Sequence, residues 1–291
     1  MTGAGKATAL RGALVALALL GPACGGSAGE DSTPGGGSLA PEGSELRRLE
    51  IAVTEPAPGR FRYLAPKTVR AGLVEIRFTN AGKATHKAQL WRVGAGHTVT
   101  EARRTRRPLP PWLRTAGGVG LTAPGATGAT IQRLAPGTYY VAGAGDEPGV
   151  VARFRATAGG GGADERDEAL PAASARVTAV DYGYRLSGIE AGASSVEFRN
   201  AGREPHHAFF SPLRAGRTLA EARAFFAGKA VGPPPVDPEQ TRETVVLEGG
   251  ERQVTRLNLQ SGRYALLCFV RDRAGGPPHT EKGMVAEVEV P

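Results

Sequence analysis

Sulfur and histidine are scarce in this sequence. Its 291 residues include two cysteines, two methionines and five histidines. So few cysteines exclude a framework of several disulfides and the paired cysteines of a structural zinc site. The sequence has no run of 18 apolar residues, so no transmembrane helix is predicted. No glycine-rich phosphate loop follows an expected strand. Apart from Met1 and Cys24, the sulfur is confined to Cys268 and Met284, which share one 17-residue window with His279.

The first 24 residues have the pattern of an export signal. Two basic residues, Lys6 and Arg11, precede a nine-residue apolar run at 12–20, which is too short to span a bilayer. Small residues then lead to Cys24, and the segment resembles a bacterial lipoprotein signal, in which such a cysteine carries the lipid. The alternative is an ordinary secretory signal in which Cys24 is incidental. Both interpretations predict export, and the first predicts an extracytoplasmic protein that is lipid-anchored to the cell membrane.

Residues 25–45 are rich in glycine, serine, proline and acidic side chains, and they predict a flexible tether. The formal net charge of the chain is +8. Lys6 and Arg11 contribute two of these charges, and the remainder favours acidic partners or an anionic surface. We expect no nucleic-acid partner for an exported protein. If Cys24 carries lipid, Cys268 has no cysteine to pair with. A lone exported thiol implies burial, a metal or an intermolecular bond.

The chain contains two copies of one unit. Residues 78–86 align without a gap with 198–206, and the same offset of 120 continues further along both copies. A glycine run followed by a run of charged residues separates the copies and is typical of a linker. The sequence therefore predicts one domain at 46–157, a linker at 158–173 and a second domain at 174–291.

The signals within each copy are mostly those of strands. Apolar and polar residues alternate at 74–78 and at 286–290, as they do in half-buried strands. The Glu-Gly-Gly-Glu sequence between 244–247 and 252–259 predicts a hairpin. Short strands at regular spacing, separated by glycine and proline turns, favour a β-sandwich.

One short helix interrupts each copy. Thr98 and Glu101 form the pattern of a capping box, and Thr218 and Glu221 repeat it in the second copy. Gly228 is expected to end the second helix. We therefore expect an all-β protein of two tandem Greek-key β-sandwich domains, each with one short helix.

Three motifs of the second copy carry a family resemblance. An Asn-Ala-Gly turn at 200–202 leads to Pro205 and His206, and the sequence Gly-Arg-Tyr-Ala-Leu-Leu-Cys ends at Cys268. Near the end of the given sequence, His279 is followed by Gly-Met at 283–284. These motifs are similar to those of the cupredoxins, the blue-copper proteins. The similarity covers 174–291 in motifs and extends to 46–157 in architecture alone.

The resemblance implies one copper ion per chain, in the second domain. Its ligands would be the two imidazoles of His206 and His279, the thiolate of Cys268 and the weakly bound thioether of Met284. Such a set serves both Cu(I) and Cu(II), so it suits one-electron transfer or copper carriage. His207 replaces His206 as the ligand if the register shifts by one residue. We expect a redox partner protein, or a copper donor or acceptor.

The first copy lacks the matching ligands. Gly143 aligns with Cys268, and 140–157 contains no histidine, cysteine or methionine, so a metal-free domain is expected. It does keep His86, which leaves open a structural role for the matching His206. Five histidines are too few for further copper centres, so we expect no enzyme.

Two alternatives remain open. One is a metal-free cupredoxin-fold scaffold that binds a partner. The other is a Cys268–His279 nucleophile pair, for which the sequence offers no group to orient the imidazole.

Overall fold

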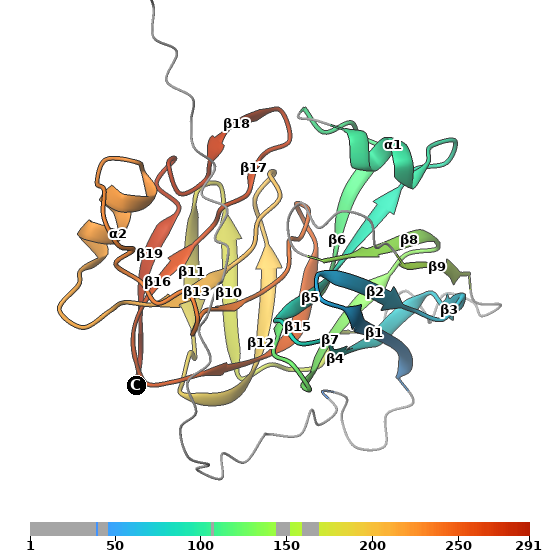
Figure 1. The fold of residues 1–291 in the computed structure, drawn as a ribbon, viewed down its shortest axis with the longest axis horizontal. Helices are drawn as coiled ribbons and strands as arrows, with labels where there is room; N and C mark the ends of the chain where they lie inside the picture. Colours follow the sequence, from blue (N-terminus) through green and yellow to red (C-terminus); the bar gives the residue numbers. More distant parts are fainter. Residues whose placement is uncertain (1–38, 40–45, 106–107, 144–151, 159–168) are drawn as a thin grey trace, which may run out of the picture. The chain divides into compact units, whose positions relative to one another are not determined.

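Nineteen strands and two short helices form the described part of the chain in this computed structural model (Figure 1). The described residues are 39, 46–105, 108–143, 152–158 and 169–291. The expected all-β class is confirmed. The predicted signal at 1–24, with Cys24, and all of the predicted tether except Leu39 lie outside these residues. Neither described helix has the length and apolar character needed to cross a membrane.

The elements of the first copy are, in chain order, β1 (Arg47–Ala57), β2 (Arg60–Leu64), β3 (Thr68–Arg70), β4 (Gly72–Ala81), β5 (His86–Val93), α1 (Val99–Arg104), β6 (Leu113–Thr122), β7 (Thr127–Leu134), β8 (Gly137–Ala142) and β9 (Ala152–Thr157).

The elements of the second copy are β10 (Ala175–Val180), β11 (Gly183–Ser187), β12 (Gly192–Asn200), β13 (Phe209–Pro212), α2 (Leu219–Phe226), β14 (Arg242–Glu243), β15 (Arg252–Leu259), β16 (Gly262–Leu267), β17 (Arg271–Asp272), β18 (Gly275–Pro278) and β19 (Val285–Val290).

The two copies share one eight-stranded sheet, which the sequence did not predict. Its order is β11-β10-β12-β15-β7-β4-β1-β2, so the copies meet where β15 pairs antiparallel with β7. Thr255 of β15 lies opposite Thr130 of β7, and their hydroxyl oxygens are 3.0 Å apart. The described residues all belong to one compact unit. The division into domains at 46–157 and 174–291 stays a prediction.

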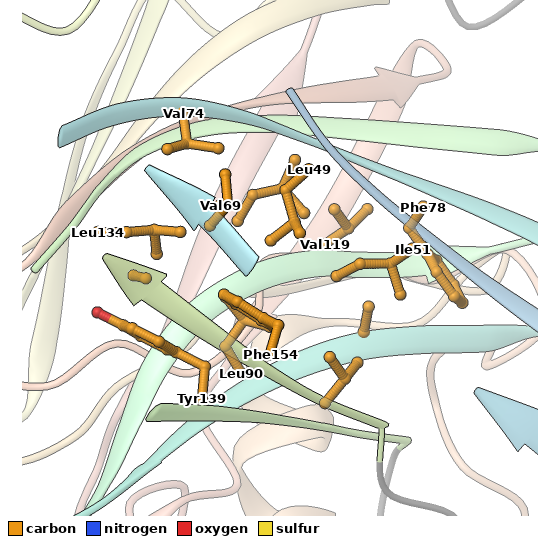
Figure 2. Packing of buried hydrophobic residues seen from close by; sticks show 14 of the residues in the cluster. Leu49, Ile51, Val69, Val74, Phe78, Leu90, Val119, Leu134, Tyr139 and Phe154 are labelled. Carbon is orange, nitrogen blue, oxygen red and sulfur yellow. The ribbon is translucent and has the colours of Figure 1, made fainter. Parts of the chain in front are cut away.

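A second sheet covers each half of the shared sheet. In the first copy it has the order β3-β9-β8-β5-β6, and in the second the order β14-β13-β16-β19. Alternate residues of a strand point to opposite faces, so Leu49, Ile51 and Val53 of β1 are all buried. They pack with Leu90 and Phe154 of the opposite sheet, as Figure 2 shows for part of this cluster.

The predicted helix starts are confirmed. Thr98 and Glu101 close a capping box at α1, and Thr218 and Glu221 close one at α2. Gly228 follows the end of α2 with a φ of +69°, a conformation that favours glycine.

The predicted hairpin between 244–247 and 252–259 is wrong. β15 already has β12 on one side and β7 on the other, so no edge remains for a third strand. Residues 244–247 instead run beside the segment that precedes β13, where Leu247 and His206 form an isolated β-bridge. This bridge places the peptide of His206 at the end of the second sandwich.

Candidate metal centre

Three of the predicted ligands converge in the second copy. The Sγ atom of Cys268 lies 3.4 Å from Nδ1 of His279 and 3.8 Å from Nδ1 of His206. The two Nδ1 atoms are 3.0 Å apart. All three residues are fully buried. We call these three side chains the donor cluster. In the described part of the chain it is the one group of at least three His, Cys, Asp or Glu side chains arranged to hold a metal ion.

His206 is held by the turn that follows β12. The Asn200 amide donates to the carbonyls of Glu204 and Leu247, at 2.8 and 2.9 Å, and accepts the N–H of Gly202 at 2.9 Å. The bridge with Leu247 then fixes the backbone of His206 on both sides, with N···O distances of 3.0 and 2.9 Å. A buried amide with three partners fixes the turn and therefore the direction of the imidazole.

Cys268 directly follows β16 and faces the core as expected. Because side chains alternate along a strand, Tyr264, Leu266 and Cys268 pack in one apolar cluster, while Ala265 and Leu267 pack in another on the opposite face. Cys268 is the free cysteine of the described residues.

A small hairpin returns the chain from Cys268 to His279. β17 pairs with β18, and Gly275 and Gly276 have φ values of +100° and +98°. These are conformations that L side chains rarely adopt, so the glycines permit the reversal. Thr280 N–H then donates to the carbonyl of Cys268 at 3.0 Å. The ten residues between Cys268 and His279 thus fold back through their own hairpin, which brings the two side chains together.

Met284 lies in the same region. It is fully buried and belongs to the apolar cluster that contains Cys268. Its N–H donates to the carbonyl of His279 at 2.9 Å, so a single tight turn links the two residues.

His207 points away from the donor cluster. Its Nε2 accepts the N–H of Phe269 at 2.9 Å, and its ring lies 4.5 Å from that of Phe209. It therefore supports the peptide that follows Cys268. Of the two histidines that the sequence left open, the geometry places His206 among the donors.

Both donor imidazoles are bonded on their outer side to a carboxylate. Nε2 of His206 lies 2.7 Å from Oδ1 of Asp181, and Nε2 of His279 lies 2.9 Å from Oδ1 of Asp272. Neither carboxylate is predicted from the sequence, because neither is part of a ligand motif. In the structure Asp181 directly follows β10, which pairs in parallel register with β12, the strand that leads to Asn200.

Burial sets the protonation of the donors. It lowers the pKa of His279 to about 4 and also lowers the pKa of His206, so both imidazoles are neutral at pH 7. Burial raises the pKa of the Cys268 thiol to about 11. Two neutral imidazoles are ready to donate lone pairs, whereas the thiol gives up its proton only when a cation stabilises the thiolate.

The first copy keeps the turn without the donor cluster. Asn80 donates to the carbonyls of Ala84 and Thr122, both at 2.8 Å, and accepts the N–H of Gly82 at 2.9 Å, as Asn200 does with its own neighbours. The ring of Phe61 packs 4.5 Å from that of His86. Asparagine and the following histidine are therefore features of the turn itself, and Cys268 and His279 distinguish the second copy.

Comparisons with known proteins add the following. No family model and no curated protein matches the chain. The chain is similar to solved structures of cupredoxin-fold proteins. One is a multicopper oxidase, with 16% identity over 88% of this chain and 93% of that chain and a TM-score of 0.23. Another is auracyanin from Roseiflexus castenholzii, with 19% identity over 40% and 94% and a TM-score of 0.26.

A third is the copper-containing nitrite reductase from Thermus scotoductus, with 12% identity over 84% of this chain and 61% of that chain and a TM-score of 0.21. Identities and TM-scores this low support no functional assignment. The metal centre therefore rests on the side chains of this protein. Two imidazoles and a thiol, buried together beside a thioether, make a type 1-like copper site.

Proposed function

We propose that this protein is a one-electron carrier that would bind a single copper ion through His206, Cys268 and His279, with the thioether of Met284 as a further, weak ligand. The observation that carries the proposal is the preassembled donor cluster, whose three donor atoms lie within 4.8 Å of one another. Bound copper would supply a one-electron couple. The chain contributes a fixed set of nitrogen and sulfur donors, which limits rearrangement between the two oxidation states.

Burial favours electron transfer over copper carriage. The donor side chains are completely shielded from solvent, and His206 and His279 are each tied by backbone hydrogen bonds. A carrier that hands its ion to a partner must let the partner's ligands reach the metal. Here that step would require opening of the bridge to Leu247 or of the hairpin that returns to His279.

The retention of copper and the rate of electron exchange distinguish electron transfer from copper carriage. The full chain is loaded with copper and challenged with a chelator, and its oxidation by a small inorganic oxidant is followed in a stopped-flow instrument. We expect fast, reversible one-electron oxidation and slow loss of copper. Fast loss of copper to the chelator, with slow oxidation, would favour carriage. Cys268→Ser serves as the control that lacks the thiolate.

The structure supplies an orienting group for the alternative Cys268–His279 nucleophile pair, but the thiol is not accessible to a substrate. Asp272 orients His279, which lies 3.4 Å from the Cys268 sulfur, as in a catalytic triad. However, the thiol is fully buried and its pKa is raised to about 11, so it is neither ionised nor reachable by a substrate. The metal-free scaffold remains the alternative that copper titration tests.

Export and anchoring are further parts of the proposal. They are supported by the basic residues, apolar run and Cys24 of the first 24 residues and by the glycine-rich segment that follows. A positively charged exported part suits an acidic redox partner near the membrane. The test is expression with a labelled fatty acid. We expect label in the membrane fraction for the native chain and none in Cys24→Ala.

A further inference from the structure

Each ligand histidine of the proposed site has its own carboxylate, and each carboxylate is itself held in place. Asp181 accepts the N–H groups of Arg203 and Glu204, at 2.9 and 3.3 Å. Its side chain is 26% exposed, whereas that of its partner His206 is fully buried. The carboxylate therefore lies between the imidazole and solvent, fixed by the turn that also positions the imidazole.

The second carboxylate is fixed by a different set of groups. Asp272 accepts the hydroxyl of Tyr182 at 3.1 Å and forms an ion pair with the ammonium of Lys282. The ring of Tyr182 also packs 5.0 Å from that of His279. His279, Tyr182 and Lys282 thus all place polar hydrogens at this carboxylate, and one of the three is a cation. These contacts fix the orientation of Asp272 and stabilise its negative charge.

Gly202 leaves room for the first of these bonds. A Cβ atom at this position would lie 2.2 Å from Oδ1 of Asp181 and 2.9 Å from Nε2 of His206. Both distances are shorter than real contacts of a Cβ atom. The close approach of carboxylate and imidazole therefore depends on glycine here.

The first copy shows which role of the carboxylate belongs to the turn alone, because it has the turn and lacks the donor cluster. Strand pairing aligns Val53 with Asn80 and Ala179 with Asn200, so Glu55 holds the position that corresponds to Asp181. Glu55 accepts the N–H of Lys83 at 2.9 Å, as Asp181 accepts that of Arg203. Support of the turn is thus common to both carboxylates, and Glu55 provides a matched control in the copy that lacks the donor cluster.

The geometry leads us to infer that Asp181 and Asp272 are positioning residues that set both the tautomer of the ligand histidines and the preference of the site for divalent copper. This inference rests on the proposed copper function. A carboxylate that accepts a hydrogen bond from Nε2–H keeps the proton on Nε2. Nδ1 is then unprotonated, and its lone pair points toward Cys268. The carboxylate also adds negative charge close to the ion, which stabilises Cu(II) more than Cu(I).

The charges at the site predict opposite effects for the two carboxylates and for Lys282. The Cys268 thiolate, the two carboxylates and the ammonium of Lys282 together carry a net charge of −2, which bound Cu(II) would neutralise and bound Cu(I) would not. Removing a carboxylate charge should therefore favour Cu(I). Removing the Lys282 charge should favour Cu(II).

The experiment measures the Cu(I) and Cu(II) affinities and the reduction potential of the full chain. Asp181→Asn and Asp272→Asn keep an acceptor oxygen and remove the charge. Each should lower the Cu(II)-to-Cu(I) affinity ratio about tenfold, which raises a one-electron potential by about 59 mV. Lys282→Met should shift the potential the other way, and Glu55→Gln should leave it unchanged. Shifts of one sign for all the site variants, or none beyond that of Glu55→Gln, would overturn the charge effect.

A copper-free measurement tests the positioning effect. Nitrogen NMR of the imidazoles in the metal-free native chain should show protonated, exchange-protected Nε2 atoms for His206 and His279. Asp272→Ala should remove the protection at His279 alone, and Asp181→Ala at His206 alone. Unprotected Nε2 atoms in the native chain would overturn the positioning role. If the native chain binds no copper, the proposed function fails while this measurement still reports on the carboxylates.

Discussion

The Nδ1 atoms of His206 and His279 lie 3.0 Å apart although 73 residues separate them in the sequence. Both nitrogens face the sulfur of Cys268, so three lone-pair donors converge on one buried point. Positive charge at that point is stabilised by all three. The arrangement explains why a soft cation fits a part of the core that is otherwise apolar.

The first prediction concerns which of the two adjacent histidines is the ligand. His206→Ala should abolish stoichiometric copper binding, because it removes one of the three converging donors. His207→Ala should retain one copper per chain, because this ring bonds to the N–H of Phe269 and lies outside the donor cluster. Metal analysis after desalting provides the measurement. Copper retained by His206→Ala and lost by His207→Ala would show that the register is shifted by one residue.

Copper binding should also depend on pH with a definite sign. The Cys268 thiol has its pKa raised to about 11, so between pH 6 and 8 each bound copper displaces one proton. The affinity should rise about tenfold per pH unit over this range. Below about pH 4 the dependence should steepen, since His279 is then protonated as well. Competition with a chelator of known affinity gives the slope, and a flat profile would show that the thiolate is not a ligand.

The asparagine of the turn allows a matched pair of variants. Asn200→Ala and Asn80→Ala each remove three side-chain hydrogen bonds from a buried turn. Each should lower the free energy of unfolding by about 2 kcal/mol. Copper affinity should fall in Asn200→Ala alone, because only this turn carries a ligand. Equal loss of affinity in both variants would mean that the turn acts through overall stability.

A buried ion pair joins the two copies. Lys87 Nζ lies 2.8 Å from Glu243 Oε1, and the carboxylate is fully buried. Lys87→Met should cost about 3 kcal/mol of unfolding free energy, because it leaves a buried carboxylate without its cation. Burial raises the pKa of Glu243, so the loss should shrink as the pH falls toward the pKa of an ordinary glutamate and the carboxyl takes up a proton.

The double variant Lys87→Met with Glu243→Gln provides the control. It should recover most of the lost stability, since no unpaired charge remains. Chemical denaturation at pH 5 and pH 7 measures both effects. A double variant as unstable as Lys87→Met would contradict the role given to this pair.

Much of the fold and of the donor cluster could be predicted from local patterns. Capping boxes, strand alternation and the spacing around Cys268 act within a few residues, so the sequence displays them directly. The shared sheet could not be predicted, because the pairing of β15 with β7 depends on contacts between residues about 125 positions apart. The same holds for Asp181 and Asp272. Their importance arises from the imidazoles they meet in space and not from any motif.

The most direct test of the account is copper titration of the full chain, followed by visible spectroscopy and metal analysis. We predict an intense thiolate-to-copper band that saturates at one copper per chain and is absent from Cys268→Ser. A colourless protein that takes up no stoichiometric copper would contradict the account and would leave the fold as a metal-free scaffold.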